Sequence, residues 1–199
     1  MVRKPHGIAS SFGDTTSVLD QIINQQQWPI PQLQDQRSKQ TQNKELGLVN
    51  RLDIVTAGLL FFAKNPSIYA EYKILQEQGK TQKIYYADLW GEFTQTTEVT
   101  TPIYHHYSDN ARMTVQSDIA RWKAHQVQTQ IIPLFYDQEK NYTTCQITIA
   151  KGIRHQIRVH TASIGHHILG DKLYCPKHIK SHYDGKAIHL RSMGMQVQD

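Results

Sequence analysis

The sequence predicts an α+β domain with a mixed, mostly antiparallel β-sheet core and a few flanking helices. Its 199 residues suit one domain, so we expect a single domain over residues 1–199. Between residues 46 and 150 several segments alternate apolar and polar side chains, as strands do. Helical periodicity is confined to a few short segments that do not alternate regularly with the strands, which argues against a parallel βαβ sheet.

The first 47 residues predict one helix and one long loop. Residues 15–27, "TTSVLDQIINQQQ", place apolar side chains at helical spacing, and Asp14 or Thr15 could cap the helix. Residues 27–47, "QWPIPQLQDQRSKQTQNKELG", are rich in glutamine and hold two prolines. We expect this stretch to form a surface loop.

Residues 46–79 predict two strands and a helix. "LGLVNRLD" (46–53) and "GLLFFAK" (58–64) are expected to be short strands around a turn at "IVTAG". A helix should follow, with Asn65 as its cap, Pro66 in its first position and Gly79 as its stop. Its inward face is expected to carry Ile68, Tyr72 and Leu75.

Residues 82–93, "QKIYYADLWGEF", alternate as a strand. Tyr85, Ala87 and Leu89 should share one face, with Ile84, Tyr86 and Asp88 on the other. Further strands are expected at 101–107, 111–117, 124–136 and 142–150.

A second helix is expected over residues 152–165, "GIRHQIRVHTASIG". Ile153, Ile157, His160 and Ile164 would form a buried stripe on it. Arg154 and Arg158, four residues apart, would then present two guanidinium groups on the adjoining face. These two arginines could be solvated surface charges, or they could meet phosphates and a carboxylate in a cleft.

Charge and cysteine usage restrict the class of protein. The net charge is +5 and the pI about 9.1, and residues 151–191 hold eight Lys or Arg against two acidic residues. This segment predicts a polyanionic partner, with a solvated basic face as the alternative. Two cysteines thirty residues apart, no signal peptide and no membrane-length apolar run indicate a soluble, cytoplasmic protein.

Asp53 is the most informative single residue. It follows Arg51 and leads into the apolar run "GLLFF", where burying a lone carboxylate would be costly. One interpretation is an aspartate that ends a strand and starts a turn, and the other is a catalytic carboxylate. Tyr85 and Tyr86 are, by residue type, ordinary strand residues.

Metal and nucleotide chemistry have little support. Cys175, His178 and His182 form a loose set of three ligand types, from which a metal-dependent hydrolase is a minor alternative. The chain has no GxxxxGK[ST] phosphate loop and no GxGxxG after a strand. We therefore expect neither a metal nor a cofactor.

Four segments, in this order, resemble the RluA-type RNA pseudouridine synthases. "KPHGIASSFG" (4–13) is similar to that family's opening Lys-Pro-x-Gly segment, and "NRLDIVTAGLLFFAK" (50–64) to the segment with the nucleophile. "KIYYA" (83–87) resembles Lys-x-Tyr-x-Ala. "GIRHQIRVHTASIGHHILGDKLY" (152–174) is similar to Gly-Arg-Thr-His-Gln-Ile-Arg-Val-His-Leu followed by a Gly-His-Pro-Ile-Leu-Gly-Asp run. The resemblance covers nearly the whole chain and implies the pseudouridine synthase-like α+β fold.

The resemblance also implies roles for particular residues. Asp53 would be the catalytic aspartate, Tyr85 the tyrosine that packs on the uracil, and Arg158 the arginine that pairs with the aspartate. Arg51 would occupy the space left by the flipped nucleotide. The other residues predicted to bind substrate are Asn50, Lys83, Arg154, His155 and Ile157.

The implied function is isomerisation of uridine in structured ribosomal or transfer RNA. The alternative is a catalytically inert RNA-binding protein with the same fold. We expect a monomer, with no membrane partner and no separate appended RNA-binding module.

Overall fold

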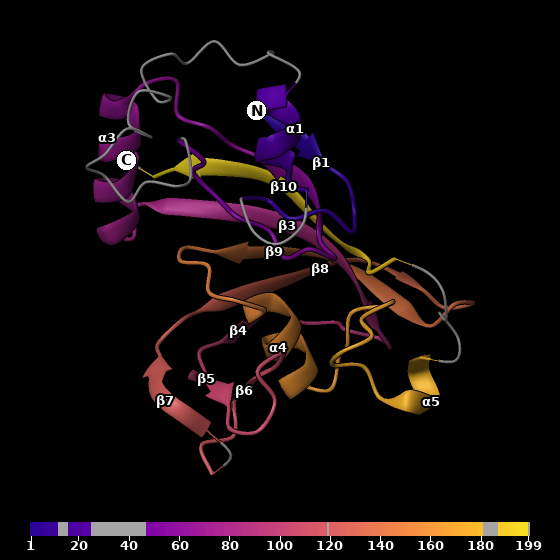
Figure 1. Ribbon diagram of the computed structural model, residues 1–199. Coiled ribbons are helices and arrows are strands. Elements are labelled where there is room, and N and C mark those ends of the chain that lie inside the picture. Colours follow the sequence, from indigo (N-terminus) through magenta and orange to yellow (C-terminus); the bar gives the residue numbers. More distant parts are fainter. Residues whose placement is uncertain (12–15, 25–46, 119, 181–186, 199) are drawn as a thin grey trace. The chain divides into compact units, whose positions relative to one another are not determined.

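The chain divides into two units, residues 1–80 and residues 81–198 (Figure 1). The computed structural model describes residues 1–11, 16–24, 47–118, 120–180 and 187–198. The predicted Gln-rich loop and the proposed caps Asp14 and Thr15 lie outside these ranges. A division into units does not by itself separate domains, so the expectation of one domain stays a prediction.

Within its described residues, the first unit contains a two-stranded antiparallel pair and two helices. Strand β1 (Val2–Lys4) pairs with β2 (Ala57–Leu60), so that Lys4 lies opposite Gly58. Ser17 directly precedes helix α1 (Val18–Asn24). Its hydroxyl accepts from the Asp20 N–H, while the Asp20 carboxylate accepts from the Ser17 N–H and hydroxyl. This reciprocal cap satisfies donors that the first helical turn would otherwise leave unpaired.

Helix α3 (Pro66–Glu77) forms as the sequence predicts. Asn65 Oδ1 accepts from the Ile68 N–H at 2.9 Å, Pro66 takes the first helical position, and Gly79 follows the helix at φ +75°. Tyr72 is buried, but Ile68 remains 43% exposed, so its predicted inward position is wrong.

The strand predicted over residues 46–53 does not form in its described part, residues 47–53. Leu48 makes an isolated bridge to Phe62, and the Val49 N–H donates to the Phe61 carbonyl. Asn50 then ends the pairing, because its side-chain amide takes the partners that a strand backbone would use. Its Nδ2 donates to the Leu59 carbonyl and its Oδ1 accepts from the Phe61 N–H.

The second unit contains an antiparallel sheet of five strands in the order β10-β3-β9-β8-β4. The strands are β3 (Thr81–Trp90), β4 (Thr97–Val99), β8 (Thr129–Asp137), β9 (Tyr142–Ile149) and β10 (Leu190–Val197). A second sheet has the order β6-β5-β7, with β5 (Ile103–His106), β6 (Met113–Thr114) and β7 (Ala120–His125). The single strand predicted over 124–136 is therefore two strands in different sheets.

The alternation predicted for β3 is confirmed. Tyr85, Ala87 and Leu89 are buried, whereas Tyr86 is 40% exposed. On the buried face, Tyr85 lies opposite Ile147 of β9 and Ser192 of β10. A β-bulge in β10 directly follows Ser192, and such bulges re-aim neighbouring side chains.

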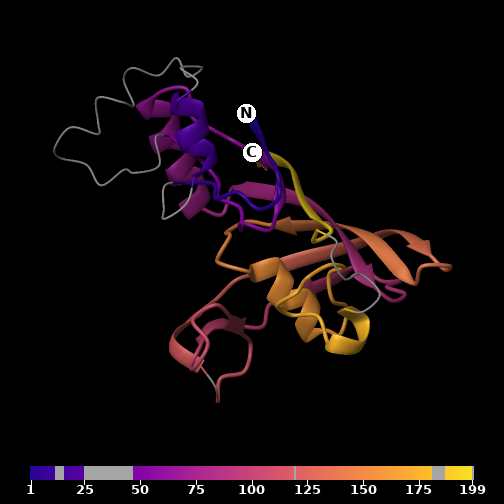
Figure 2. The same ribbon diagram turned by 45° about the vertical axis from the view of Figure 1, so that its right-hand side comes forward.

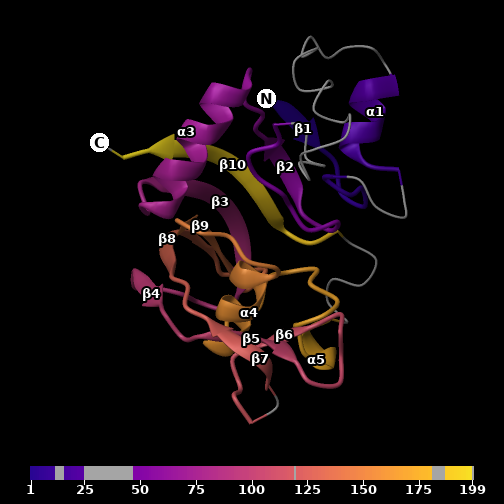
Figure 3. The ribbon, with the colours of Figure 1, turned by 60° about the vertical axis from the view of Figure 1, so that its left-hand side comes forward.

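Helix α4 (Gln156–Ser163) lies between the two sheets of the second unit, as Figures 1, 2 and 3 all show. Val159 packs there against Ile103 and Met113. The short helix α5 (Lys177–Lys180) follows later in the chain. Within the described residues, no helix has the length and apolar character that crossing a membrane requires.

The start of α4 differs from the prediction. His155 has φ +57°, a left-handed conformation that separates Ile153 and Arg154 from the helix. The expected stripe is therefore reduced to Ile157 and His160, because Ile164 also lies beyond the helix end. Arg158 is 6% exposed, so the first of its two interpretations, a solvated surface charge, is wrong.

His160 shows how tightly α4 is held. Its Nε2 lies 2.9 Å from the Thr101 carbonyl, and its Nδ1 lies 2.8 Å from the Thr129 hydroxyl. A carbonyl only accepts, so Nε2 carries a proton. Gln156 Nε2 donates to the same Thr129 hydroxyl. Burial lowers the pKa of His160, which favours the neutral ring with Nδ1 accepting from that hydroxyl.

Candidate active site

Asp53 begins a tight turn in the first unit. Its carbonyl accepts from the Thr56 N–H at 2.9 Å, and Ile54 and Val55 form the tip, 54% and 40% exposed. Aspartate is favoured at the first position of such turns. The turn explains why the sequence places a carboxylate just ahead of β2, and it leaves the side chain partly exposed.

The amino-terminal segment holds this turn in place by hydrogen bonds. The Ser10 hydroxyl donates to the Leu52 carbonyl and accepts from the Leu52 N–H, both at 3.0 Å. The Gly7 N–H donates to the Ile54 carbonyl at 2.8 Å, and His6 Nδ1 lies 2.6 Å from the Val55 carbonyl. The residues on both sides of Asp53 are thus fixed by a segment more than forty positions earlier.

Lys4 places a buried cation beside the Asp53 turn. Its side chain is fully buried, and Nζ donates to the carbonyls of Pro5 at 2.9 Å and Ile54 at 3.0 Å. Burial lowers the pKa of Lys4 to about 8, although the negative charge of Asp53 opposes that shift. The Asp53 carboxylate therefore lies in the field of a lysine bonded to its own turn.

The two residues predicted to bind substrate ahead of Asp53 differ in their surroundings. Asn50 is buried, and both of its amide groups bond to the backbone around β2. Arg51 is exposed. The geometry gives Asn50 a clear structural role, and its contact with substrate stays a prediction.

In the second unit, Lys83 and Tyr85 share the buried face of β3. Lys83 Nζ lies 3.6 Å from the position that a Cβ would take at Gly152. The lysine thus reaches the chain segment that leads into α4. The alternation of β3 accounts for this placement, because residues two apart point to the same face of a sheet.

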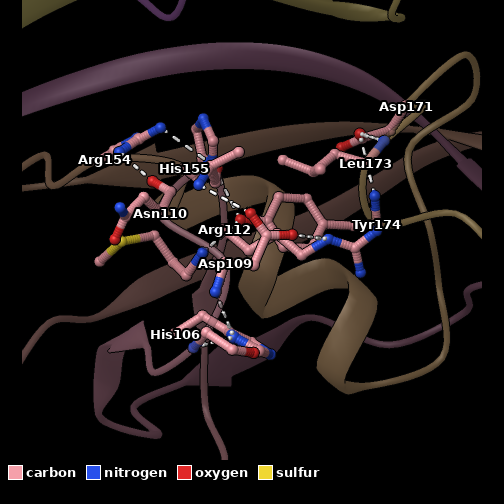
Figure 4. A network of polar contacts seen from close by, with 12 residues as sticks. His106, Asp109, Asn110, Arg112, Arg154, His155, Asp171, Leu173 and Tyr174 are labelled. Atoms are coloured by element: carbon pink, nitrogen blue, oxygen red, sulfur yellow. Dashed lines mark hydrogen bonds and ion pairs between the residues drawn. The ribbon is translucent and has the colours of Figure 1, made fainter. Parts of the chain in front are cut away.

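Arg158 is held by a carboxylate that the sequence analysis did not select. Its Nε and Nη2 donate to the two oxygens of Asp171, each at 2.8 Å, and both side chains are buried. The ring of Tyr174 lies 5.2 Å from the Arg158 Cζ. Figure 4 shows Asp171, Leu173 and Tyr174 close to one another.

Arg154 and His155 have separate partners in the second unit. Arg154 is exposed and donates to the carbonyls of Asn110 and Ala111, at 2.9 and 3.3 Å (Figure 4). His155 Nδ1 lies 2.8 Å from the Tyr174 hydroxyl. Arg154 therefore bonds to the loop that precedes β6, and it does not share a face with Arg158.

Ile157 is buried, 5% exposed, in the first turn of α4. Its predicted substrate contact has no support from this position and stays a prediction. Asp53 belongs to the first unit, while Tyr85 and Arg158 belong to the second.

Three residues that shape these sites were missed by sequence reasoning. Lys4 and Ser10 stand in the quoted opening segment, and Asp171 stands in the quoted "GDKLY" run. Their positions inside motif-like segments were the available signal. Their partners, Ile54, Leu52 and Arg158, could not be read from the sequence.

The residues considered for a metal are only partly described. In the ranges that the structure covers, no three His, Cys, Asp or Glu side chains gather as metal ligands would. Cys175 is buried and His178 exposed, while His182 lies outside those ranges.

Comparison with known proteins identifies the family. The model of the RNA pseudouridylate synthase family matches residues 1–163. A dual-specificity RNA pseudouridine synthase RluA from Vibrio cholerae is 31% identical over 150 residues, which are 75% of this chain and 59% of that protein. An uncharacterized RNA pseudouridine synthase from Chloroflexus aurantiacus is 30% identical, over 75% of this chain and 45% of the relative.

The chain belongs to the RNA pseudouridylate synthase family. The family match confirms the resemblance found in the four sequence segments. The fold agrees as well, because the human RNA pseudouridylate synthase domain containing 1 superposes with a TM-score of 0.74 at 16% identity. That alignment covers 98% of this chain and 73% of the human one, and it confirms the α+β fold.

The chain spans about half the length of the curated relatives it matches, between 39% and 59% for the first three. The match to the family accordingly covers residues 1–163 of this chain.

Proposed function

We propose that the protein isomerises uridine to pseudouridine in RNA, with Asp53 as the nucleophile. The observation that carries the proposal is the turn at residues 53–56, in a chain that belongs to the RNA pseudouridylate synthase family. The turn holds a partly exposed carboxylate on a backbone that five hydrogen bonds from Lys4, His6, Gly7 and Ser10 immobilise. Fixed geometry of this kind is what a nucleophile requires.

The proposed reaction exchanges one bond of the uracil for another. The Asp53 carboxylate attacks C1′ of the sugar or C6 of the base, and the bond between N1 and C1′ breaks. The uracil turns, C5 bonds to C1′, and the bond between the Asp53 oxygen and C1′ or C6 breaks, which restores the carboxylate. Tyr85 takes the proton from C5 while N1 gains one. No atom is gained or lost and no electron pair leaves, so the chemistry requires neither a metal nor a redox cofactor.

Two arginines support the reaction in this proposal. Arg158 pairs with the Asp53 carboxylate. Arg51, which is exposed beside the turn, fills the space that the target nucleotide leaves when it flips out of its stack. Flipping costs a few kcal/mol, which contacts with phosphates and stacking in the pocket offset.

The proposed substrate is structured ribosomal or transfer RNA. The Vibrio cholerae relative is named a dual-specificity RNA pseudouridine synthase, and a relative from Haemophilus ducreyi is named for the large ribosomal subunit. The basic segment 151–191 suits a phosphate backbone. We place the protein, as a monomer, in the cytoplasm with these RNAs.

The test uses RNA that carries tritium at C5 of uridine, because forming the new bond at C5 releases that tritium. The protein should release tritium from total RNA, and mapping the product uridine would distinguish ribosomal from transfer RNA. RNA binding without any release of tritium would contradict the proposal and would favour the inert RNA-binding protein.

A further inference from the structure

The ion pair between Asp171 and Arg158 fixes the plane of the guanidinium group. Arg158 Nε donates to Oδ2 and Nη2 to Oδ1, both at 2.8 Å. Two parallel bonds of this kind set both the position and the rotation of the group, which a single bond cannot do. The pair is 6% and 1% exposed, so water competes little for it.

Asp171 is itself held rigidly by the chain that follows it. Its Oδ1 also accepts from the backbone N–H groups of Leu173 and Tyr174, at 2.9 and 3.3 Å. Burial alone would raise the pKa of the Asp171 carboxyl, but the hydrogen bonds and charge of Arg158, with these two N–H groups, lower it below the ordinary value. The carboxylate is therefore ionised and aimed before any substrate is present.

The turn that carries Asp171 depends on Gly170. Its φ of +74° suits glycine, and a Cβ at this position would lie 2.4 Å from the Ala187 carbonyl oxygen. The close approach of these two segments admits no larger residue. The backbone that places Asp171 is thus fixed by packing.

Tyr174 supports the same guanidinium from another side. Its ring lies 5.2 Å from Arg158 Cζ, within the range of a cation–π contact. Its hydroxyl accepts from the Met113 N–H at 2.8 Å and lies 2.8 Å from His155 Nδ1. The tyrosine is therefore anchored at its hydroxyl, to β6 and to the entry of α4, while its ring contacts Arg158.

We propose that Asp171 is a positioning residue that directs Arg158, with Tyr174 as its support. Because Asp171 binds the Nε and Nη2 edge, it dictates where the remaining donors of the guanidinium point. The inference rests on the proposed function, in which Arg158 pairs with the nucleophile. Asp171 acts through Arg158 and does not itself touch the substrate.

The variants separate positioning from mere stability. Asp171→Asn removes the charge, and Asp171→Glu restores it but displaces the guanidinium by one methylene group. Tyr174→Leu removes the ring and its hydroxyl anchor. Asp109→Asn is the matched control, because Asp109 forms an exposed ion pair with Arg112 at 3.1 Å.

We expect Asp171→Asn to lower the single-turnover rate of tritium release at least 100-fold and to leave RNA affinity within threefold. Asp171→Glu should regain the thermal stability of the wild type while its rate stays at least tenfold low, and Asp109→Asn should keep the wild-type rate. If Asp171 had a purely structural role, Asp171→Glu would regain the wild-type rate of tritium release together with the wild-type stability. If Asp171→Asn does not fold, Asp171→Glu and Tyr174→Leu decide the question.

Nuclear magnetic resonance gives a readout that needs no RNA. The Arg158 Nε–H signal, assigned by its loss in Arg158→Lys, should be protected from exchange in the wild type and lose that protection in Asp171→Asn. A wild-type protein that releases no tritium would overturn the proposed function. An active wild type with an unchanged rate and Nε–H signal in folded Asp171 variants would overturn this inference alone.

Discussion

Ser10 offers a direct test of how the nucleophile turn is held. Its hydroxyl is the hydrogen-bond partner of both the N–H and the carbonyl of Leu52, the residue before Asp53, at 3.0 Å each. Leu52 is 8% exposed and Ser10 4%, so water reaches neither well. Ser10→Ala removes both bonds and adds no bulk.

The expected loss follows from these two bonds. A hydrogen bond contributes about 0.5–1.5 kcal/mol net, so Ser10→Ala should lower the free energy of unfolding by about 2 kcal/mol. For a chain of this size that loss corresponds to a Tm lower by about 4–8 °C. The turn should also become less well ordered, and displacement of a reacting group by about 1 Å can cost about 100-fold in rate.

The assay compares Ser10→Ala with Ser67→Ala, an exposed serine in the first turn of α3. Denaturant unfolding gives the free energy, and single-turnover release of tritium gives the rate. Ser10→Ala should lose both stability and rate, with saturating RNA failing to restore the rate. Equal stability and rate in the two variants would refute the role given to the amino-terminal segment.

Further predictions concern protons and the turn. Burial lowers the pKa of His160 despite its bond to Thr101, so below pH 6.5 the unfolded state binds more protons than the folded state and the free energy of unfolding should fall. In denaturant titrations, His160→Gln should weaken this dependence of the free energy of unfolding on pH. The pKa of Lys4 is lowered from 10.5 to about 8, so between pH 8 and pH 10.5 the unfolded state binds more protons and the free energy of unfolding should rise with pH. A rise that persists in Lys4→Met would contradict this. Asn50→Ala should lower the free energy of unfolding by about 2 kcal/mol, and an unchanged melting curve would show that its two bonds matter little.

Local signals in the sequence predicted the elements that depend on local interactions. The bounds of α3 follow from Asn65, Pro66 and Gly79, each of which acts within one turn of the helix. The faces of β3 follow from its alternation. Neither prediction needed a residue from elsewhere in the chain.

The errors arose where a distant partner decides the conformation. The predicted strand before Asp53 does not form, because the side-chain amide of Asn50 bonds to the backbone around β2 where the backbone of a paired strand would bond. Helix α4 begins late because His155 is left-handed, with its ring against Tyr174. The sequence left open whether Arg158 is a surface charge or meets a carboxylate in a cleft, because nothing local indicates that Asp171 buries it.

The sequence predicted which residues form the candidate site, but it did not predict the neighbouring residues that hold them. Asp53, Tyr85 and Arg158 came from the family resemblance, and their chemical roles stay predictions. The structure adds the residues that hold them, namely Ser10 and Lys4 at the turn and Asp171 at the arginine. Hydrogen bonds between segments far apart in sequence leave no periodic pattern by which to find them.

The most direct measurement is the single-turnover release of tritium from uridine-labelled RNA by Asp53→Asn, with RNA affinity measured on the same protein. The exposed Asp118→Asn serves as its matched control. If Asp53 is the nucleophile, Asp53→Asn releases no tritium and binds RNA with wild-type affinity, while Asp118→Asn keeps the wild-type rate. Tritium release by Asp53→Asn at the wild-type rate would contradict the assignment.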